Sequence, residues 1–236
     1  IENDQGILLT YFRNNILHLF IISSLIASLI LHNGKVQRDD IAGVLDTIYP
    51  FLQAELFLKW EKQQLADVLT RELEALIQAE LVLDDGSGTL YSPAPNSAAF
   101  SQLTVLAAPV QQSLERYFMT LTLITQQGTG RMTAKQIEDL SHLLGQRLSI
   151  LYEFNAPEFF DRTLFKSFVE ALAKFDYLQI DDEQMIHFDH RLERMAEDSR
   201  LILNADTLNT LQHMTCVTDE EVDTAMQAIA KKKERR

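Results

Sequence analysis

Residues 81–91 read Leu81-Val82-Leu83-Asp84-Asp85-Gly86-Ser87-Gly88-Thr89-Leu90-Tyr91. Two short apolar runs flank an Asp-Gly pair, which is a strong hairpin signal because glycine accepts a positive φ. Just upstream, apolar residues recur at helical spacing at Leu73, Leu76 and Ile77. The pattern predicts a helix that leads directly into a small β-hairpin.

The same pattern occurs again later in the chain. Apolar residues recur at helical spacing over 165–172, and a second hairpin pattern follows near 177–188 with the acidic stretch 181–184 as its turn. Earlier landmarks recur as well, such as Gly34-Lys35-Val36 and Gly130-Arg131-Met132, with about 96 to 106 residues between matching positions. We interpret the chain as two related helical units.

The predicted fold is mainly α, with tandem helical units that resemble winged helices, each ending in a small β-hairpin. The first unit covers 1–95 and the second covers 96–205, because the breaker cluster Ser92-Pro93-Ala94-Pro95-Asn96-Ser97 separates them. The remaining residues, 206–236, are predicted to hold a C-terminal helix near Asp219 to Lys231 and a basic tail.

The composition narrows the classes of partner. The chain of 236 residues has 46% hydrophobic residues and a formal net charge of -13. Because nucleic-acid binding depends on Lys and Arg at phosphates, this charge argues against nucleic acid, and it argues equally against attachment of the chain's body to anionic lipid. The expected hairpins and their preceding helices are themselves acidic, so a protein-interaction module is the better interpretation than a DNA reader. A single cysteine, Cys216, fits a reducing compartment.

The apolar block from Ile16 to Leu31 admits several interpretations. A helix of this length is about 24 Å long, which is short for a membrane span. A core helix buried on nearly all sides is one interpretation, and it would make His18 a buried, hydrogen-bonded histidine. A helix against a neighbouring domain or in the membrane interface is the second, and a transmembrane span is the third.

Four segments carry a resemblance to a known family. They are Leu9-Thr10-Tyr11-Phe12-Arg13-Asn14-Asn15; Tyr49-Pro50-Phe51-Leu52-Gln53-Ala54-Glu55-Leu56-Phe57-Leu58-Lys59-Trp60; Gln146-Arg147-Leu148-Ser149-Ile150-Leu151; and Asn155-Ala156-Pro157-Glu158-Phe159-Phe160-Asp161. In this order and spacing they resemble the C-terminal region of the bacterial membrane-associated glycerol-3-phosphate 1-O-acyltransferases. The resemblance covers roughly 6–205, while the tail from about Asn209 to Arg236 carries no part of it.

The resemblance implies a parent enzyme that transfers a fatty acyl group from acyl-CoA or acyl carrier protein to the sn-1 hydroxyl of glycerol-3-phosphate in phospholipid biosynthesis. It implies a place at the cytoplasmic face of the bacterial inner membrane through the parent, with the catalytic domain of the same enzyme as partner. The chain begins with Ile1, which fits a piece of a longer protein. The family's catalytic His and Asp, separated by four residues, have no match here, so we expect no catalytic residue, no cofactor and no metal, and an inactive fragment.

The remaining site candidates are weak. Arg13, Asn14 and Asn15 form a polar cluster at the mouth of the apolar helix, suited to contact the catalytic domain or the substrate phosphate, although a solvated helix end explains them equally. His187-Phe188-Asp189-His190 could bring two imidazoles and a carboxylate together, but no further ligand is near in sequence. Cys216 follows His213 at helical spacing without any sign of a pocket.

Two functional hypotheses follow. The first is a non-catalytic region that packs on the catalytic domain of a glycerol-3-phosphate acyltransferase. The alternative is a free-standing tandem winged-helix-like adaptor that binds a protein partner. An exposed apolar face on the Ile16–Leu31 helix would favour the first, because such a face would lack its partner. A fully buried helix would favour the second.

Overall fold

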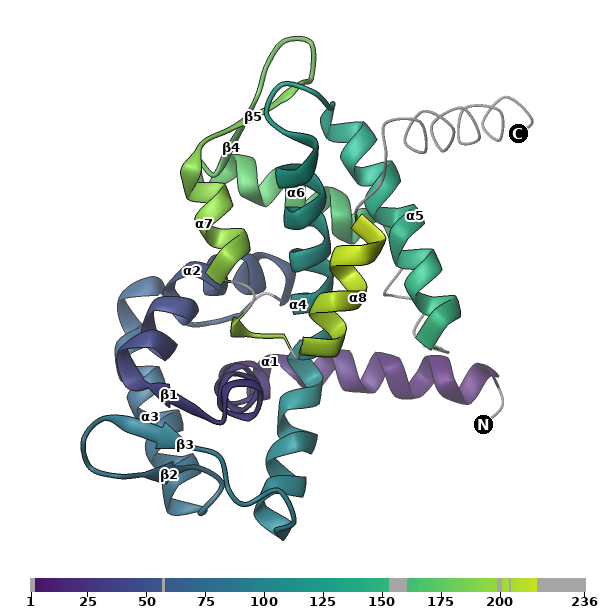
Figure 1. Cartoon of the computed structure of the whole chain (residues 1–236). Coiled ribbons are helices and arrows are strands. Elements are labelled where there is room, and N and C mark those ends of the chain that lie inside the picture. Colours follow the sequence, from purple (N-terminus) through teal and green to yellow (C-terminus); the bar gives the residue numbers. More distant parts are fainter. Residues whose placement is uncertain (1–2, 57, 153–160, 199–200, 204, 216–236) are drawn as a thin grey trace. The chain divides into compact units, whose positions relative to one another are not determined.

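The computed structural model describes residues 3–56, 58–152, 161–198, 201–203 and 205–215. These residues are mainly helical, as predicted, and form two compact units. Unit 1 comprises residues 1–114 and 201–204, and unit 2 comprises 115–200 and 205–236. Figure 1 shows the helices and the two small antiparallel sheets.

Unit 1 alternates helices and strands in a fixed order. Its elements are α1 (Asn3–Asn33), β1 (Lys35–Gln37), α2 (Arg38–Leu56), the 3₁₀ turn η1 (Lys62–Gln64), α3 (Leu65–Gln78), β2 (Leu83–Asp84) and β3 (Thr89–Tyr91). The three strands form one sheet in the order β1-β3-β2, with Val36 opposite Leu90 and Leu83 opposite Tyr91. The first hairpin therefore lies where the Asp-Gly signal placed it.

Helix α1 supplies much of the core of unit 1. Ile21, Leu25, Ile26 and Ile30 are at most 1% exposed, which follows from their spacing along one broad apolar stripe. The helix ends at Gly34, whose φ of 71° is easy for glycine and whose N–H donates to the Ile30 carbonyl at 2.9 Å. The chain can then reverse directly into β1.

Unit 2 repeats this order, except that a single bridge replaces its first strand. It contains the second part of α4 (Ala98–Gln127), then α5 (Ala134–Tyr152), α6 (Arg162–Lys174), β4 (Leu178–Ile180), β5 (Ile186–Phe188), α7 (His190–Asp198) and α8 (Ala205–Thr215). Strands β4 and β5 pair antiparallel, and an isolated bridge from Thr133 to Met185 takes the place that β1 has in unit 1. Inside this unit the rings of Tyr117 and Phe168 stack with centroids 4.3 Å apart.

The helix before each hairpin ends in the same way. Glu80 and Asp176 have φ values of 57° and 60°, although neither is glycine. After them, the Leu81 N–H donates to the Leu76 carbonyl at 3.0 Å, and the Tyr177 N–H donates to the Leu172 carbonyl at 2.9 Å. This left-handed termination satisfies the last carbonyls of each helix and aims the chain into the hairpin. It supports the interpretation of the two units as related.

The division between the units falls inside α4 and not at the Ser92–Ser97 breaker cluster. The predicted boundary at 95/96 precedes α4, whereas unit 1 extends to Leu114. The first part of α4 is held to α1 by Ser24, whose hydroxyl donates to the Ala107 carbonyl and accepts from the Val110 N–H, both at 3.1 Å. A breaker cluster marks where a helix begins, but tertiary contacts decide which unit that helix joins.

A short segment, 201–203, returns to unit 1 and is fixed to the end of α1. The Ile202 carbonyl accepts from the Ser28 hydroxyl at 3.1 Å and from His32 Nδ1 at 2.6 Å. Asn33 donates its amide to the Leu201 carbonyl at 2.7 Å. Because Ile202 is only 1% exposed, these side chains satisfy carbonyls that the segment would otherwise bury unpaired.

The burial of His32 makes the stability of unit 1 pH-dependent. Burial lowers the pKa of His32 below its ordinary value of 6.5, and the hydrogen bond to Ile202 offsets this only in part. The unfolded chain therefore binds this proton more readily, so the contribution of His32 to stability is present above pH 6.5 and declines below it. We expect the free energy of unfolding to fall between about pH 7.5 and 5.5, and His32→Gln to remove part of that fall. Urea unfolding of both proteins at several pH values measures it. Equal pH profiles would contradict the prediction.

The predicted C-terminal helix near Asp219 to Lys231 and the basic tail lie outside the described residues. Helices α7 and α8, which the sequence interpretation did not include, occupy 190–198 and 205–215. Leu192 and Met195 of α7 are buried, as is Leu211 of α8, so both helices pack through an apolar side.

Candidate functional site

The middle of α1 exposes an apolar face. Ile16 is 52% exposed, Leu19 is 61% exposed and Phe20 is 46% exposed. Residues separated by three or four positions lie on one side of a helix, so these side chains form one contiguous patch, which we call the α1 face. From Ile21 onward the helix is almost wholly buried. The α1 face is therefore the continuation of a core stripe beyond the elements that cover it.

Helix α3 contacts α1 at Ser23, beside the α1 face. The Ser23 hydroxyl donates to Glu72 Oε2 of α3 at 2.7 Å, so α3 reaches α1 at this turn. His18, one turn or more before it, is exposed. The expectation of a buried histidine at this position is therefore wrong, because His18 lies on the exposed side of α1, although the neighbouring Leu17 is buried.

The same helix passes a simple test for a membrane span. Residues Ile16–Asn33 have a mean hydropathy of 1.9, and 56% of them are buried within the chain. Length and composition alone cannot distinguish a span from the central helix of a globular unit. The extensive burial of 21–30 against other helices of unit 1 favours the second interpretation for that part of α1.

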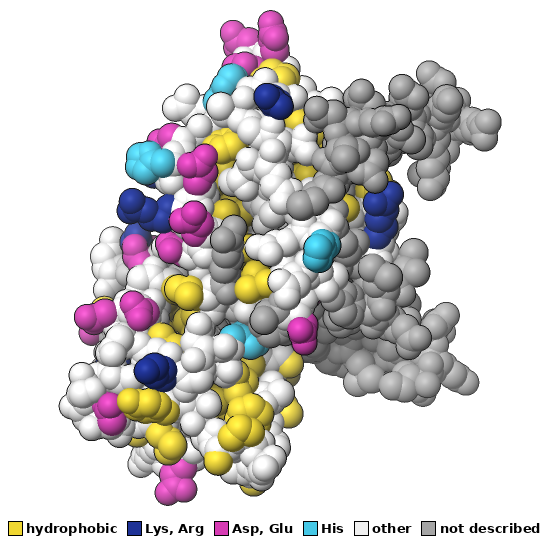
Figure 2. Space-filling view, in the orientation of Figure 1, with side chains coloured by type: hydrophobic (Ala, Val, Ile, Leu, Met, Phe, Trp, Pro, Cys, Tyr) yellow, Lys and Arg dark blue, Asp and Glu magenta, His cyan; other side chains and the backbone are white. Residues whose placement is uncertain are grey.

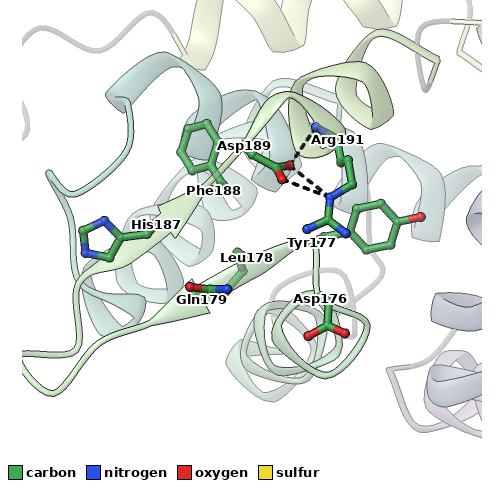
Figure 3. A pocket seen from close by; sticks show the side chains of 8 residues that line it. All are labelled: Asp176, Tyr177, Leu178, Gln179, His187, Phe188, Asp189 and Arg191. Atoms are coloured by element: carbon green, nitrogen blue, oxygen red, sulfur yellow. Dashed lines mark hydrogen bonds and ion pairs between the residues drawn. The ribbon is translucent and has the colours of Figure 1, made fainter.

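A small open pocket lies at the base of the second hairpin in unit 2. It encloses about 190 Å³ and is lined by 176–179 and 187–189 together with Arg191. In Figure 3, the Arg191 guanidinium and the Asp189 carboxylate lie together on one side of the pocket, and Asp176 lies across from them. The two Asp189 oxygens accept from Arg191 Nε at 3.2 and 3.1 Å.

His187 pairs with Asp181 and not with Asp189, its neighbour in sequence. Its Nε2 lies 2.8 Å from Asp181 Oδ2, across the hairpin, whereas Asp189 pairs with Arg191. The hydrogen bond from His187, followed by the backbone N–H of Met185, lowers the pKa of Asp181. Both side chains are more than 40% exposed, at 47% for His187 and 41% for Asp181. Figure 2 shows the acidic side chains at the tip of this hairpin.

The first hairpin has a matching pair. There the Tyr91 hydroxyl donates to Asp85 Oδ2 at 3.1 Å, with Tyr91 and Asp85 at the positions that correspond to His187 and Asp181 in the repeat. Because the same contact is made by a tyrosine in one unit and a histidine in the other, its role is to fix the turn of each hairpin. A residue-by-residue search for a histidine followed by an aspartate could not find this pair, since the two residues meet only across a turn.

The chemistry that these sites offer is binding more than catalysis. Within the described part of the chain, no group of three or more His, Cys, Asp or Glu side chains is placed to hold a metal ion. The pair His187 and Asp181 is open to solvent and lies on a hairpin tip, so little in its surroundings excludes water from a reaction. The apolar α1 face, by contrast, is a surface of the kind that partner proteins cover.

The polar cluster predicted as a contact site remains a prediction. Arg13, Asn14 and Asn15 lie within α1, but their side chains fall outside the described part of the structure. His213 is exposed on α8, and Cys216 lies outside the described residues.

Comparison with known proteins decides the family. Residues 1–181 match the family model of the glycerol-3-phosphate acyltransferase C-terminal region. The chain belongs to this family. It is 35% identical over 95% of its length to a glycerol-3-phosphate acyltransferase of Pseudomonas putida KT2440, and 34% identical over 91% of its length to one of Xanthomonas campestris pv. campestris. It is also 36% identical, over 84% of its length, to a glycerol-3-phosphate acyltransferase of Pseudomonas aeruginosa LESB58.

The glycerol-3-phosphate acyltransferase C-terminal region is one part of much longer relatives. The chain spans 27% of the Pseudomonas putida protein and 25% of the Xanthomonas protein. No solved structure matches the chain. The resemblance read from the sequence is therefore confirmed at the level of the family and of the region within it.

Proposed function

We propose that this chain is the non-catalytic C-terminal region of a glycerol-3-phosphate 1-O-acyltransferase and that it supports the catalytic part of that enzyme by packing against it. The parent would transfer an acyl group from acyl-CoA or acyl carrier protein to the sn-1 hydroxyl of glycerol-3-phosphate at the cytoplasmic face of the inner membrane. The acyl donor and the substrate would meet the parent's catalytic part and not this region.

The α1 face carries the proposal. Ile16, Leu19 and Phe20 are each about half exposed in the middle of a helix whose following turns are buried. Fully burying such a side chain is worth about 1.5–3 kcal/mol, so covering the remaining exposed half of all three would contribute roughly 2–4 kcal/mol. The matched relatives are about four times longer than this chain, and the remainder of such a polypeptide is a partner of the required kind. An exposed face is also what separates this hypothesis from a free-standing adaptor.

The order of elements supports a winged-helix architecture for both units. Helix, strand, helix, helix, strand, strand is the order of unit 1, with β3 between β1 and β2. Unit 2 follows the same order with the bridge from Thr133 to Met185 in place of the first strand. The acidic hairpin turns argue against phosphate as the ligand of these wings, so we assign them to protein contacts.

The lack of catalysis by this chain rests on residue chemistry. No histidine of the chain is followed at the fifth position by an aspartate, which is the spacing that supplies a general base in the parent family. The described pair of His187 and Asp181 lies on an exposed hairpin beside a small open pocket, which gives no enclosed room for an acyl chain.

An acyl-transfer assay with glycerol-3-phosphate and a long-chain acyl-CoA tests the proposal. The chain, the amino-terminal part of its parent and a mixture of the two are compared. We expect no activity from the chain alone and higher activity from the mixture than from the amino-terminal part. The double variant Leu19→Ser/Phe20→Ser should bind the amino-terminal part at least about 10-fold more weakly, because roughly 1.4 kcal/mol or more of apolar burial is lost.

Val105→Ser provides the matched control, because Val105 is an apolar side chain that is 74% exposed and lies on α4 instead of α1. It should bind and stimulate like the wild type. Activity from the chain alone would overturn the non-catalytic assignment. Equal binding by the Leu19/Phe20 variant and the wild type would remove the α1 face as the docking surface. An amino-terminal part that neither binds nor responds to the chain would leave the adaptor hypothesis in its place.

A further inference from the structure

Trp60 lies against two cations in the loop between α2 and α3. The ammonium of Lys59 lies 4.2 Å from the centroid of the indole ring, and the guanidinium carbon of Arg71 lies 5.0 Å from it. The backbone of this loop is fixed from α2, because the Trp60 carbonyl accepts from the Tyr49 hydroxyl at 2.7 Å and from the Gln53 amide at 2.9 Å. The half-buried ring thus holds two like charges close together by cation–π attraction.

The positive charge of this cluster is only partly matched. Among the described residues, Lys59 has no carboxylate within ion-pair distance. Arg71 contacts Glu72 Oε1 at 3.2 Å, but the other oxygen of that carboxylate already accepts from the Ser23 hydroxyl. The chain has a net charge of -13, but Lys59 and Arg71 lie together here, and the Glu72 carboxylate that contacts Arg71 also binds Ser23. The two cations therefore form a local site for an oxyanion.

A series of contacts links the cluster to the side of α1 that carries the α1 face. Ser23 lies three positions after Phe20 and seven after Ile16, which places it on the same side of α1. From Ser23 a series of contacts runs through Glu72 to Arg71 and then to the indole of Trp60. A partner that covers the α1 face would therefore meet Arg71, Trp60 and Lys59 at its edge.

We propose that Lys59, Trp60 and Arg71 form a carboxylate-binding site at the edge of the α1 face, which takes an aspartate or glutamate side chain of the parent's amino-terminal part. This inference rests on the proposed function, since the same partner covers the α1 face. An apolar centre with a polar rim is the usual arrangement of a protein interface, and Trp and Arg are enriched among the residues that contribute most to binding. The acidic body of the chain would repel an extended anionic surface, whereas a single carboxylate needs only the two cations.

The test measures the affinity of the chain for the amino-terminal part at low and high salt. The variant Lys59→Gln/Arg71→Gln removes both charges and keeps polar side chains, and Lys35→Gln is the matched control, because Lys35 is an exposed lysine of unit 1. At about 0.05 M salt we expect the double variant to bind about 10-fold more weakly than the wild type, and at about 0.5 M salt the two should converge because charge pairs at the rim are screened. Lys35→Gln should follow the wild type at both concentrations.

Each failure has its own signature. If Leu19→Ser/Phe20→Ser loses binding while Lys59→Gln/Arg71→Gln binds like the wild type at low salt, the α1 face is the docking surface and the carboxylate site is disproved. If the wild-type chain does not bind the amino-terminal part, both the docking surface and the carboxylate site are disproved. Sedimentation with phosphatidylglycerol vesicles that depends on Lys59 and Arg71, without any effect of these residues on the protein affinity, would assign the cluster to lipid phosphate and overturn the inference.

Discussion

Replacing Phe165 by alanine is expected to lower the free energy of unfolding by about 3–5 kcal/mol, the largest effect of any single change considered for this chain. Phe165 lies on α6 and is 0% exposed. Truncation removes the transfer free energy of the ring and leaves a cavity that the neighbouring helices fill only in part. Since a domain is stable by only about 5–15 kcal/mol, this loss is a large share of the stability of unit 2.

Urea unfolding followed by circular dichroism measures the effect. Phe20→Ala is the matched control, because it makes the same chemical change at a side chain that is 46% exposed, and it should cost only about 1 kcal/mol. A loss below about 1 kcal/mol for Phe165→Ala would contradict the packing of α6 described above.

Local pattern accounts for most of the elements. The helices follow from apolar residues at a period near 3.6, and the first hairpin follows from Asp85-Gly86, where Gly86 has a φ of 78°. The second hairpin could be predicted because the pattern of the first recurs. In the described part of the chain, Glu80 and Asp176 adopt positive φ without being glycine, and such positions give no signal in a single sequence.

Contacts between distant residues could not be predicted in the same way. The hydroxyl of Ser24 and the carbonyl of Ala107 are 83 residues apart, and those of Ser28 and Ile202 are 174 residues apart. The same limit affects the site. Lys59 beside Trp60 is visible in the sequence, but Arg71 joins them only because the loop between α2 and α3 folds back.

The α1 face shows what a pattern can and cannot decide. Ile16 and Leu19 continue the apolar stripe of the buried part of α1, so the sequence gives them the same character as the core. Whether a residue of this stripe is buried or exposed depends on whether a neighbouring helix covers it. Helix α1 therefore combines a buried core segment and an exposed apolar face along a single element.

Ser24→Ala is expected to destabilise the chain by about 1–3 kcal/mol, even though it removes a single oxygen atom. Pro109 lies inside α4, and a proline within a helix disrupts the hydrogen-bond ladder of the preceding turn. Ser24, itself 0% exposed, makes two hydrogen bonds to α4 beside this proline, because its hydroxyl accepts from the Val110 N–H and donates to the Ala107 carbonyl. Alanine would remove both of these hydrogen bonds from a buried position.

Ser141→Ala makes the same chemical change, but we expect no loss of stability. Ser141 is also 0% exposed, but its hydroxyl has no hydrogen-bond partner among the described residues. Removing a buried, unpaired hydroxyl relieves a desolvation cost, and alanine has the higher helix propensity, so this variant should be neutral or more stable. Thermal and urea unfolding of the two variants side by side isolate the effect of the hydrogen bonds from that of losing an oxygen. Similar destabilisation by both variants would mean that Ser24 stabilises the chain through packing and not through its hydrogen bonds to α4 beside Pro109.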